Sequence, residues 1–299
     1  MRYLVIRTEN LSKNYGRTQG IKSITLEVEP GEVYGVLGPK GAGKTTLLNT
    51  LMNLVRPSAG VVWVMGMDSV RQTSQVHTQV GYLPGTLNFP ASLTAQQVFA
   101  RLASLYGAID GVYLKQLCDR FNLDLQKQVS GMSEAEVQAL GIVHAFVRRP
   151  ELVLLDSPST NLDAERQSQL YKLIGETRTS GATVVIASES LIEMERICDR
   201  VAILHQGKLL AVERGVVLRS RALRHIEMRF AEPVMREAFS GLTNIQDLNL
   251  EDNKLRCTLQ GDPDALFKTA SQFRLLDVIS QQPSLDEVYR NFYGVWAKN

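Results

Sequence analysis

The chain has 299 residues, of which 44% are hydrophobic and 21% are charged, and its formal net charge is +2. This length and composition are typical of a folded protein with one large or two smaller domains, and they exclude an intrinsically disordered chain. The small net charge gives no electrostatic case for binding nucleic acid, and no apolar run approaches the roughly 20 residues of a membrane helix, so we expect a soluble chain that meets a membrane only through a partner.

Hydropathy patterns in the first two thirds of the chain alternate between strands and helices. Short apolar or alternating runs bounded by Gly and Pro indicate strands, and apolar spacing of three to four residues indicates helices. In chain order, the patterns predict strands at 3–6, 21–29 and 33–37, a helix at 47–52, strands at 61–65 and 80–84, helical spacing over 94–121 with a break near 107–111, a helix from 133 through 147, a strand at 152–156, a helix at 164–177, a strand at 183–187, a helix at 191–198, and paired strands at 201–204 and 208–212.

The pattern changes near residue 224. From there the sequence predicts, in order, a strand at 226–230, a helix at 234–239, strands at 245–250 and 255–259, a helix at 264–273, a strand at 275–279 and a closing helix at 284–292. The order strand, helix, strand, strand, helix, strand is that of a ferredoxin-like unit. We therefore expect two domains, residues 1–220 and residues 221–299.

A glycine-rich stretch lies between the strand predicted at 33–37 and the helix predicted at 47–52. It consists of Gly38, Pro39, Lys40, Gly41, Ala42, Gly43, Lys44, Thr45 and Thr46. Strand, glycine-rich loop and helix form the context of a P-loop, in which backbone N–H groups and a helix N-terminus surround phosphate oxygens. In such a loop Lys44 reaches the β- and γ-phosphates, and the Thr45 hydroxyl ligates Mg²⁺. The sequence therefore predicts binding of ATP or GTP.

With this loop and several further matches, the chain resembles the nucleotide-binding subunit of an ABC transporter over roughly residues 3–215. Tyr15 stands where the family has an aromatic residue that stacks on adenine. Asp156 ends a strand whose terminal carboxylate, in this family, holds the hydration shell of Mg²⁺. Leu162 and Asp163 match the loop that contacts the opposing subunit of a dimer.

The tail of the chain resembles the small C-terminal domain carried by many subunits of bacterial type-2 exporters, and residues 283–289 are similar to a recurring end motif there. The resemblance implies an α/β fold, a P-loop NTPase cassette of the ABC type with a mixed sheet and a helical subdomain, followed by a small ferredoxin-like α+β domain. It implies ATP and Mg²⁺ as cofactors, with Thr45 and Asp156 as metal ligands. It also implies an integral membrane permease and a second ATP-binding subunit as partners, no nucleic acid, and a peripheral position at the cytoplasmic face of the membrane. By resemblance, residues 94–121 are the surface that meets the permease.

Two positions depart from the family's catalytic pattern. The glutamate that normally follows the Walker B aspartate is replaced by Ser157, and a serine without an adjacent base cannot accept a proton from water near neutral pH. The histidine that touches the γ-phosphate aligns with Glu189, whose carboxylate would repel a phosphate charge at about 4 Å by about 4 kcal/mol at an effective dielectric near 20, before screening by Mg²⁺. Lys40, where the family usually has asparagine, is either a solvated loop lysine or an added positive charge near the phosphates.

The segment that covers the partner's γ-phosphate in a dimer is also altered. Without gaps, the family's Ser-Gly-Gly aligns with Ser-Glu-Ala at residues 133–135, so Glu134 takes the place of the first glycine. An alternative register through residues 129–132 needs a three-residue insertion. The glutamine expected to sense the attacking water aligns with Gly85, a change that some type-2 exporter subunits share. We therefore assign no catalytic residue.

These departures predict a subunit that binds ATP and hydrolyses it slowly or not at all, in a homodimer or a heterodimer. In one alternative, other residues supply the missing chemistry. In another, the chain is a nucleotide-binding regulatory or interaction protein of the ABC type with no transport role. A single cassette without heptads or a basic arm argues against an ABC protein of ribosomes or DNA, and the Asn-Lys-x-Asp motif of GTPases is absent because residues 253–256 end in arginine.

Overall fold

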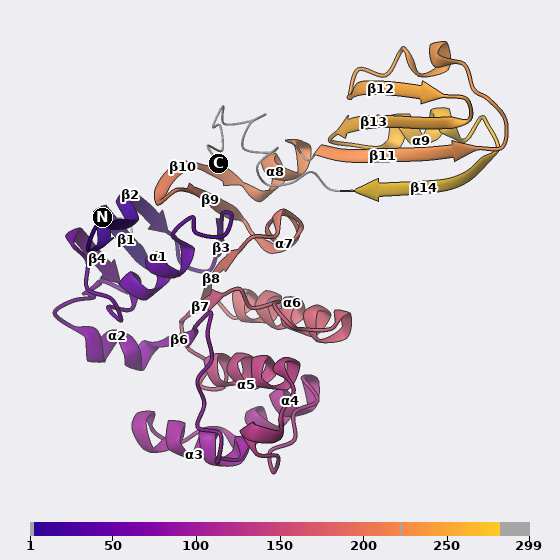
Figure 1. The fold of residues 1–299 in the computed structure, drawn as a ribbon. Coiled ribbons are helices and arrows are strands. Elements are labelled where there is room, and N and C mark those ends of the chain that lie inside the picture. The colour runs from indigo at the N-terminus through magenta and orange to yellow at the C-terminus, as the bar shows by residue number, and fades with distance from the viewer. Residues whose placement is uncertain (1–2, 222, 282–299) are drawn as a thin grey trace. The chain divides into compact units, whose positions relative to one another are not determined.

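The computed structural model describes residues 3–221 and 223–281, and the chain divides into two compact units, Met1–Glu213 and Arg214–Asn299 (Figure 1). The closing helix predicted at 284–292 and the end motif at 283–289 lie outside the described residues. Within the described ranges, no helix is both long enough and apolar enough to cross a membrane.

A six-stranded sheet forms the centre of the first unit, in the order β10-β9-β3-β8-β7-β6. Its strands are β3 Val33–Leu37, β6 Val80–Leu83, β7 Leu152–Asp156, β8 Thr183–Ser188, β9 Arg200–His205 and β10 Lys208–Arg214. The pairs from β9 through β3, β8 and β7 to β6 are parallel. Every residue of β3, β7 and β8 is buried, as expected for continuous apolar strands covered on both faces.

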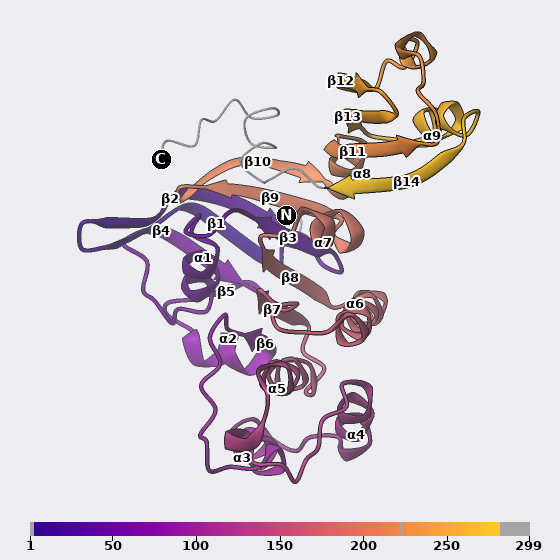
Figure 2. The same cartoon turned by 45° about the vertical axis from the view of Figure 1, so that its right-hand side comes forward.

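A second, antiparallel sheet packs in the same unit, in the order β2-β1-β4-β5 (Figure 2). Its strands are β1 Ile6–Tyr15, β2 Thr18–Val28, β4 Ala59–Val64 and β5 Met67–Asp68. The strand predicted at 3–6 is wrong in its bounds, because β1 begins at Ile6 and continues to Tyr15. Asn10 and Ser23 adopt left-handed backbone angles where the register of β1 and β2 shifts, and these irregularities interrupt the alternation beyond Thr8, so the sequence pattern did not show how far the strand continues.

Helices pack against strands of both sheets. Their bounds are α1 Lys44–Leu51, α2 Thr73–Gln79, α3 Ala95–Tyr106, α4 Gly111–Arg120, α5 Glu134–Phe146, α6 Ala164–Thr179 and α7 Leu191–Ile197, with a 3₁₀ turn at Val129–Gly131. The helices α3, α4 and α5 gather at the end of the unit away from β1 and β2 (Figure 1) and form the helical subdomain. Side chains cap their N-termini: Thr94 and Ser133 form capping boxes and Asp110 accepts two backbone N–H groups. The helix α2 was not predicted, because Val76 is its single buried residue.

The second unit is a four-stranded antiparallel sheet in the order β12-β13-β11-β14. After α8 Gly215–Arg221 come β11 Leu223–Phe230, a 3₁₀ helix at Arg236–Phe239, β12 Ile245–Glu251, β13 Lys254–Gln260, α9 Asp264–Ala270 and β14 Leu275–Gln281. Phe230, Phe239 and Phe273 pack in its core with ring centroids about 6 Å apart. This order confirms the ferredoxin-like prediction, with a short 3₁₀ helix in place of the first helix.

Candidate functional site

Three loops meet at the carboxyl-terminal edge of the six-stranded sheet. In the parallel register Leu37 of β3 lies beside Ser188 of β8, and Asp156 of β7 lies beside Ala187. The segments that follow these strands therefore meet at one edge, the usual position of ligand sites in such sheets. They border a 330 Å³ pocket. The residues that line it are Tyr15, Thr18, Gln19, Gly20, Lys40, Gly41, Gly43, Lys44, Thr45, Thr46, Ser157 and Glu189.

The glycine-rich loop has a backbone that only glycine fits at its critical positions. Gly43 has φ +101°, and a Cβ there would lie 2.6 Å from the carbonyl oxygen of Gly20. Gly43 is also the N-cap of α1 and provides no side chain to satisfy the free N–H groups of the first turn. In the described chain no protein acceptor is found for the N–H of Gly41 or Gly43. These donors and the positive end of α1 make the loop suited to an anion.

Lys44, the first residue of α1, points back over the loop. Its ammonium donates hydrogen bonds to the carbonyl oxygens of Gly38 at 2.7 Å and Pro39 at 2.9 Å, and to Oε1 of Glu189 at 3.4 Å. Its side chain is 7% exposed, whereas that of Glu189 is 55% exposed. Burial lowers the pKa of Lys44, and the carboxylates of Glu189 and Asp156 act in the opposite direction.

Thr45 and Asp156 form a pair at the bottom of the site. The Thr45 hydroxyl donates to Oδ2 of Asp156 at 2.6 Å, and Asp156 is 2% exposed. Burial raises the pKa of Asp156, while hydrogen bonds from Thr45 and Ser157 and the charge of Lys44 lower it. A hydroxyl and a carboxylate side by side fit a hard cation such as Mg²⁺, which usually takes one or two protein oxygens and completes its shell with water and phosphate. Among the described residues, no group of three or more His, Cys, Asp or Glu side chains is arranged so that it could hold a metal ion.

Tyr15 ends β1 at the rim of the pocket with 46% of its surface exposed. Lys13 lies with its Nζ 5.2 Å from the centroid of the Tyr15 ring. A Cβ on Gly20 would come within 2.9 Å of the same ring, so this glycine lets the tyrosine lie close to β2. The exposed ring is therefore available to stack on a flat ligand.

Ser157 and Glu189, which replace the family's catalytic glutamate and histidine, both line the pocket. Ser157 has φ +53°, and its N–H donates to the Ala187 carbonyl at 2.8 Å. Its hydroxyl lies 3.4 Å from Oδ1 of Asp156. Gln138 of α5 donates from Nε2 to the carbonyls of Ser157 and Pro158, at 3.4 and 3.0 Å, and so ties the helical subdomain to this loop.

Several features of the site have no clear signal in the sequence. A Cβ on Gly85 would lie 2.8 Å from Oδ2 of Asp156, so the glycine leaves room for that carboxylate. The residues that β2 contributes to the pocket, Thr18 to Gly20, were not predicted either. Lys40 is exposed and lines the pocket, whereas Glu134, exposed in the first turn of α5, does not.

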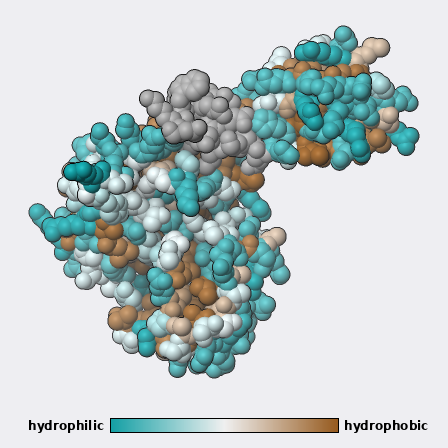
Figure 3. Space-filling model, in the orientation of Figure 1, coloured by the Kyte–Doolittle hydropathy of each residue, from teal (hydrophilic) through white to brown (hydrophobic). Residues whose placement is uncertain are grey.

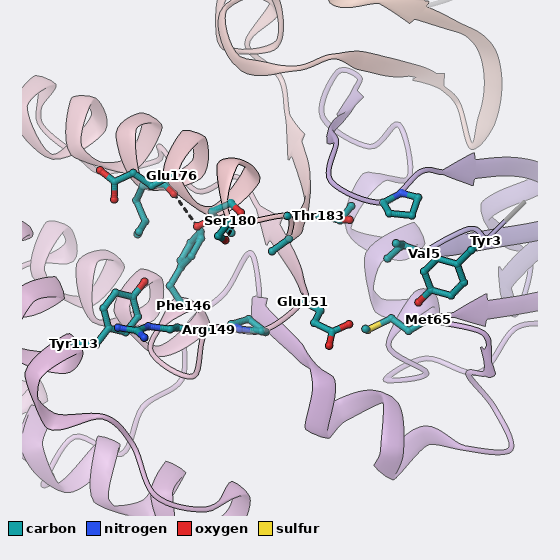
Figure 4. A pocket seen from close by; sticks show the side chains of 16 residues that line it. Tyr3, Val5, Met65, Tyr113, Phe146, Arg149, Glu151, Glu176, Ser180 and Thr183 are labelled. Carbon is teal, nitrogen blue, oxygen red and sulfur yellow. Dashed lines mark hydrogen bonds between the residues drawn. The ribbon is translucent and has the colours of Figure 1, made fainter.

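Two further pockets lie in the first unit. One, of 520 Å³, lies near residues that precede β7 and begin β8, at the sheet edge opposite the glycine-rich loop (Figure 4). Two of its charged groups have partners within the chain, since Arg149 stacks on Tyr113 at 4.2 Å and Glu176 pairs with Arg120 at 2.8 Å.

The other pocket, of 390 Å³, lies between β6 and the helical subdomain, where hydrophobic surface gathers (Figure 3). Leu87, Phe89, Leu102 and Tyr106 give it an apolar lining. His144 also lines it, and burial, helped by the Arg148 charge, lowers the pKa of His144 to about 4.

Known proteins are similar to this chain in sequence and fold. Residues 21–160 match the model of the ABC transporter family. The bacitracin transport ATP-binding protein BcrA of Enterococcus faecalis is 31% identical over 259 residues, covering 84% of this chain and 83% of that protein. The linearmycin resistance ATP-binding protein LnrL of Bacillus subtilis is 24% identical over 306 residues, covering 97% and 98%. A solved ATP-binding subunit of an ABC transporter is 26% identical, with a TM-score of 0.66 over 70% of this chain and 90% of that one.

Proposed function

This chain belongs to the family of ABC transporter ATP-binding proteins, and from that premise we propose that it binds Mg²⁺-ATP and couples the binding to movement of a separate membrane permease. The observation that carries the proposal is the arrangement around Lys44, with unpaired loop N–H groups on one side and the pair of Thr45 and Asp156 on the other. A triphosphate and a hard cation fit these two halves of the site.

Each residue of the site has a proposed role. The loop from Gly38 to Thr46 holds the phosphates through its backbone N–H groups, and Lys44 neutralises part of their charge. Tyr15 stacks on the adenine ring. Thr45 and Asp156 hold Mg²⁺, which when bound neutralises phosphate charge. The Thr45 hydroxyl, which here donates to Asp156, and the buried Asp156 carboxylate are the oxygen groups that would hold the metal.

The position that follows Asp156 carries no general base. Ser157 occupies it, and its hydroxyl, which lies 3.4 Å from the carboxylate of Asp156, does not itself accept a proton from water near neutral pH. A positioned general base typically contributes about 10²- to 10⁴-fold to a rate. We therefore propose that bound ATP is cleaved slowly or not at all, and that closure of a dimer around ATP supplies the work of the subunit.

The proposed partners are an integral membrane permease and a second ATP-binding subunit, identical or different, with this chain at the cytoplasmic face of the membrane. The pocket beside β6 supports the permease contact, because α3 lines it with Leu102 and Tyr106 and an apolar groove suits an apolar partner surface. We also propose that the chain has two domains, residues 1–220 and residues 221–299.

The test is nucleotide binding by the full chain, measured by calorimetry with Mg²⁺-ATP. Lys44→Ala removes the buried ammonium and is expected to weaken binding at least about 100-fold, since hydrogen bonds to charged groups contribute about 1.5–3 kcal/mol each and several are lost. Lys40→Ala is the matched control: it removes the same charge from the same loop at an exposed position and should weaken binding far less. No binding by the unaltered chain, or equal losses in both variants, would contradict the proposal.

A further inference from the structure

We propose that Glu189 is a specificity-determining residue that makes this site discriminate against the γ-phosphate. ADP therefore competes with ATP far better at this site than it would at the same site with a neutral side chain at position 189. The inference deepens the proposed function and rests on it, because it concerns which nucleotide the same site retains.

The first step concerns the hydrogen-bond acceptors around the Lys44 ammonium. An ammonium has three donors, and three acceptors surround this one: two backbone carbonyls of the loop and Oε1 of Glu189. The carbonyls of Gly38 and Pro39 are the short contacts and belong to the loop that forms the site. The carboxylate at 3.4 Å is the longest contact. A phosphate oxygen that binds Lys44 therefore replaces Glu189.

The second step is how the chain presents Glu189. Ser188, the residue before it, ends β8, and its hydroxyl accepts the N–H of Ser190 at 3.0 Å. Ser190 in turn caps α7 by accepting the N–H of Glu193 at 3.2 Å. The backbone at 189 is thus fixed between a strand end and a helix cap. The displaced carboxylate can rotate toward solvent, but its Cα stays at the pocket wall.

The third step is charge. Among the side chains that line the pocket, Lys40 and Lys44 are positive and Glu189 is negative; Asp156, below them, is engaged with Thr45. Lys44 in a P-loop serves both the β- and the γ-phosphate. A phosphate oxygen of either nucleotide replaces the Glu189 carboxylate at the ammonium, but a triphosphate brings an additional negative charge toward the carboxylate that remains at the pocket wall. Like charges at such distances repel, although solvent screens an exposed carboxylate.

The expected effect is a change in the ratio of two affinities. Glu189→Gln keeps the size of the side chain and removes its charge. It should lower the dissociation constant of ATP by about tenfold more than that of ADP, a figure that allows for screening of an exposed group. Glu189→Asp keeps a carboxylate and should leave the ATP-to-ADP ratio near that of the unaltered chain.

The experiment measures the dissociation constants of Mg²⁺-ATP and Mg²⁺-ADP for the full chain and three variants, with thermal melting to show that each is folded. Glu151→Gln is the matched control, because Glu151 is an exposed glutamate that precedes β7 at the opposite edge of the sheet. The proposal expects the affinity ratio to shift in Glu189→Gln alone. An unchanged ratio in Glu189→Gln, or an equal shift in Glu151→Gln, would overturn it while leaving the proposed function intact. Binding of neither nucleotide would overturn both.

Discussion

Replacing Ser157 with glutamate is expected to raise the rate at which bound ATP is cleaved by about 10²-fold, the lower end of what a positioned general base contributes. The residue is well placed for the change. Its N–H is held by the Ala187 carbonyl at 2.8 Å, and its left-handed φ of +53° strains serine and glutamate alike. The substitution therefore adds a base without adding backbone strain.

The charge of Asp156 explains why the expected rate increase in Ser157→Glu lies at the lower end of the range for a general base. The Ser157 hydroxyl lies 3.4 Å from Oδ1 of Asp156, so a glutamate there starts beside a buried carboxylate. At about 4 Å and an effective dielectric near 20, two such charges repel by about 4 kcal/mol, which raises the pKa of the new base until Mg²⁺ offsets part of the repulsion. The added rate should therefore increase with pH between about 6 and 9.

The assay is single-turnover cleavage of radiolabelled ATP. The protein is in excess and concentrated enough to bind all of the ATP, so that the weakening of ATP binding proposed for Glu189 does not limit the signal. Ser157→Gln is the control, because it has the length of glutamate and no basic carboxylate. If Ser157→Glu cleaved ATP no faster than Ser157→Gln although both bound it, the missing base would not be the reason for slow hydrolysis.

Two further outcomes follow from contacts in the first unit. Gly85→Ala places a Cβ 2.8 Å from Oδ2 of Asp156 and should raise the Mg²⁺ concentration needed for half-maximal ATP binding about tenfold, measured by magnesium titration. An unchanged titration would mean that the carboxylate has room to move. His144 has a folded-state pKa of about 4, below its ordinary value of 6.5, so its neutral form contributes stability that is complete above pH 6.5 and is lost as the pH falls toward 4. The free energy of unfolding in urea should therefore fall by about 2 kcal/mol less in His144→Gln than in the unaltered chain when the pH is lowered from 7 to 4.5. An identical fall in both proteins would contradict the role of His144.

The sequence was enough to predict the elements on which the site is built. Continuous apolar runs at 33–37, 152–156 and 183–187 marked strands buried on both faces, and the structure has β3, β7 and β8 there. The spacing of the glycines predicted a phosphate loop, because the conformation of such a loop depends on residues that are adjacent in the sequence. The family and the fold followed from these motifs and are confirmed by the comparisons.

What the sequence could not give are contacts between segments far apart in the chain. The pairing of Lys44 with Glu189 and the close approach of Gly85 to Asp156 depend on the register of parallel strands, which apolar runs do not specify. The pattern at 3–6 missed most of β1 for a related reason, since register shifts against β2 after Thr8 interrupt the alternation of the strand. The helix α2 has almost no buried face and so gives no periodic signal.

The most direct test is the chemical fate of bound nucleotide, because the central claim is that this chain binds a triphosphate but lacks the groups that normally cleave it. ATP incubated with excess protein and Mg²⁺ should bind in a Lys44-dependent way and be recovered mostly intact after many minutes. Recovery as ADP at a rate within the usual enzymatic range of about 1–10³ s⁻¹ would contradict the account.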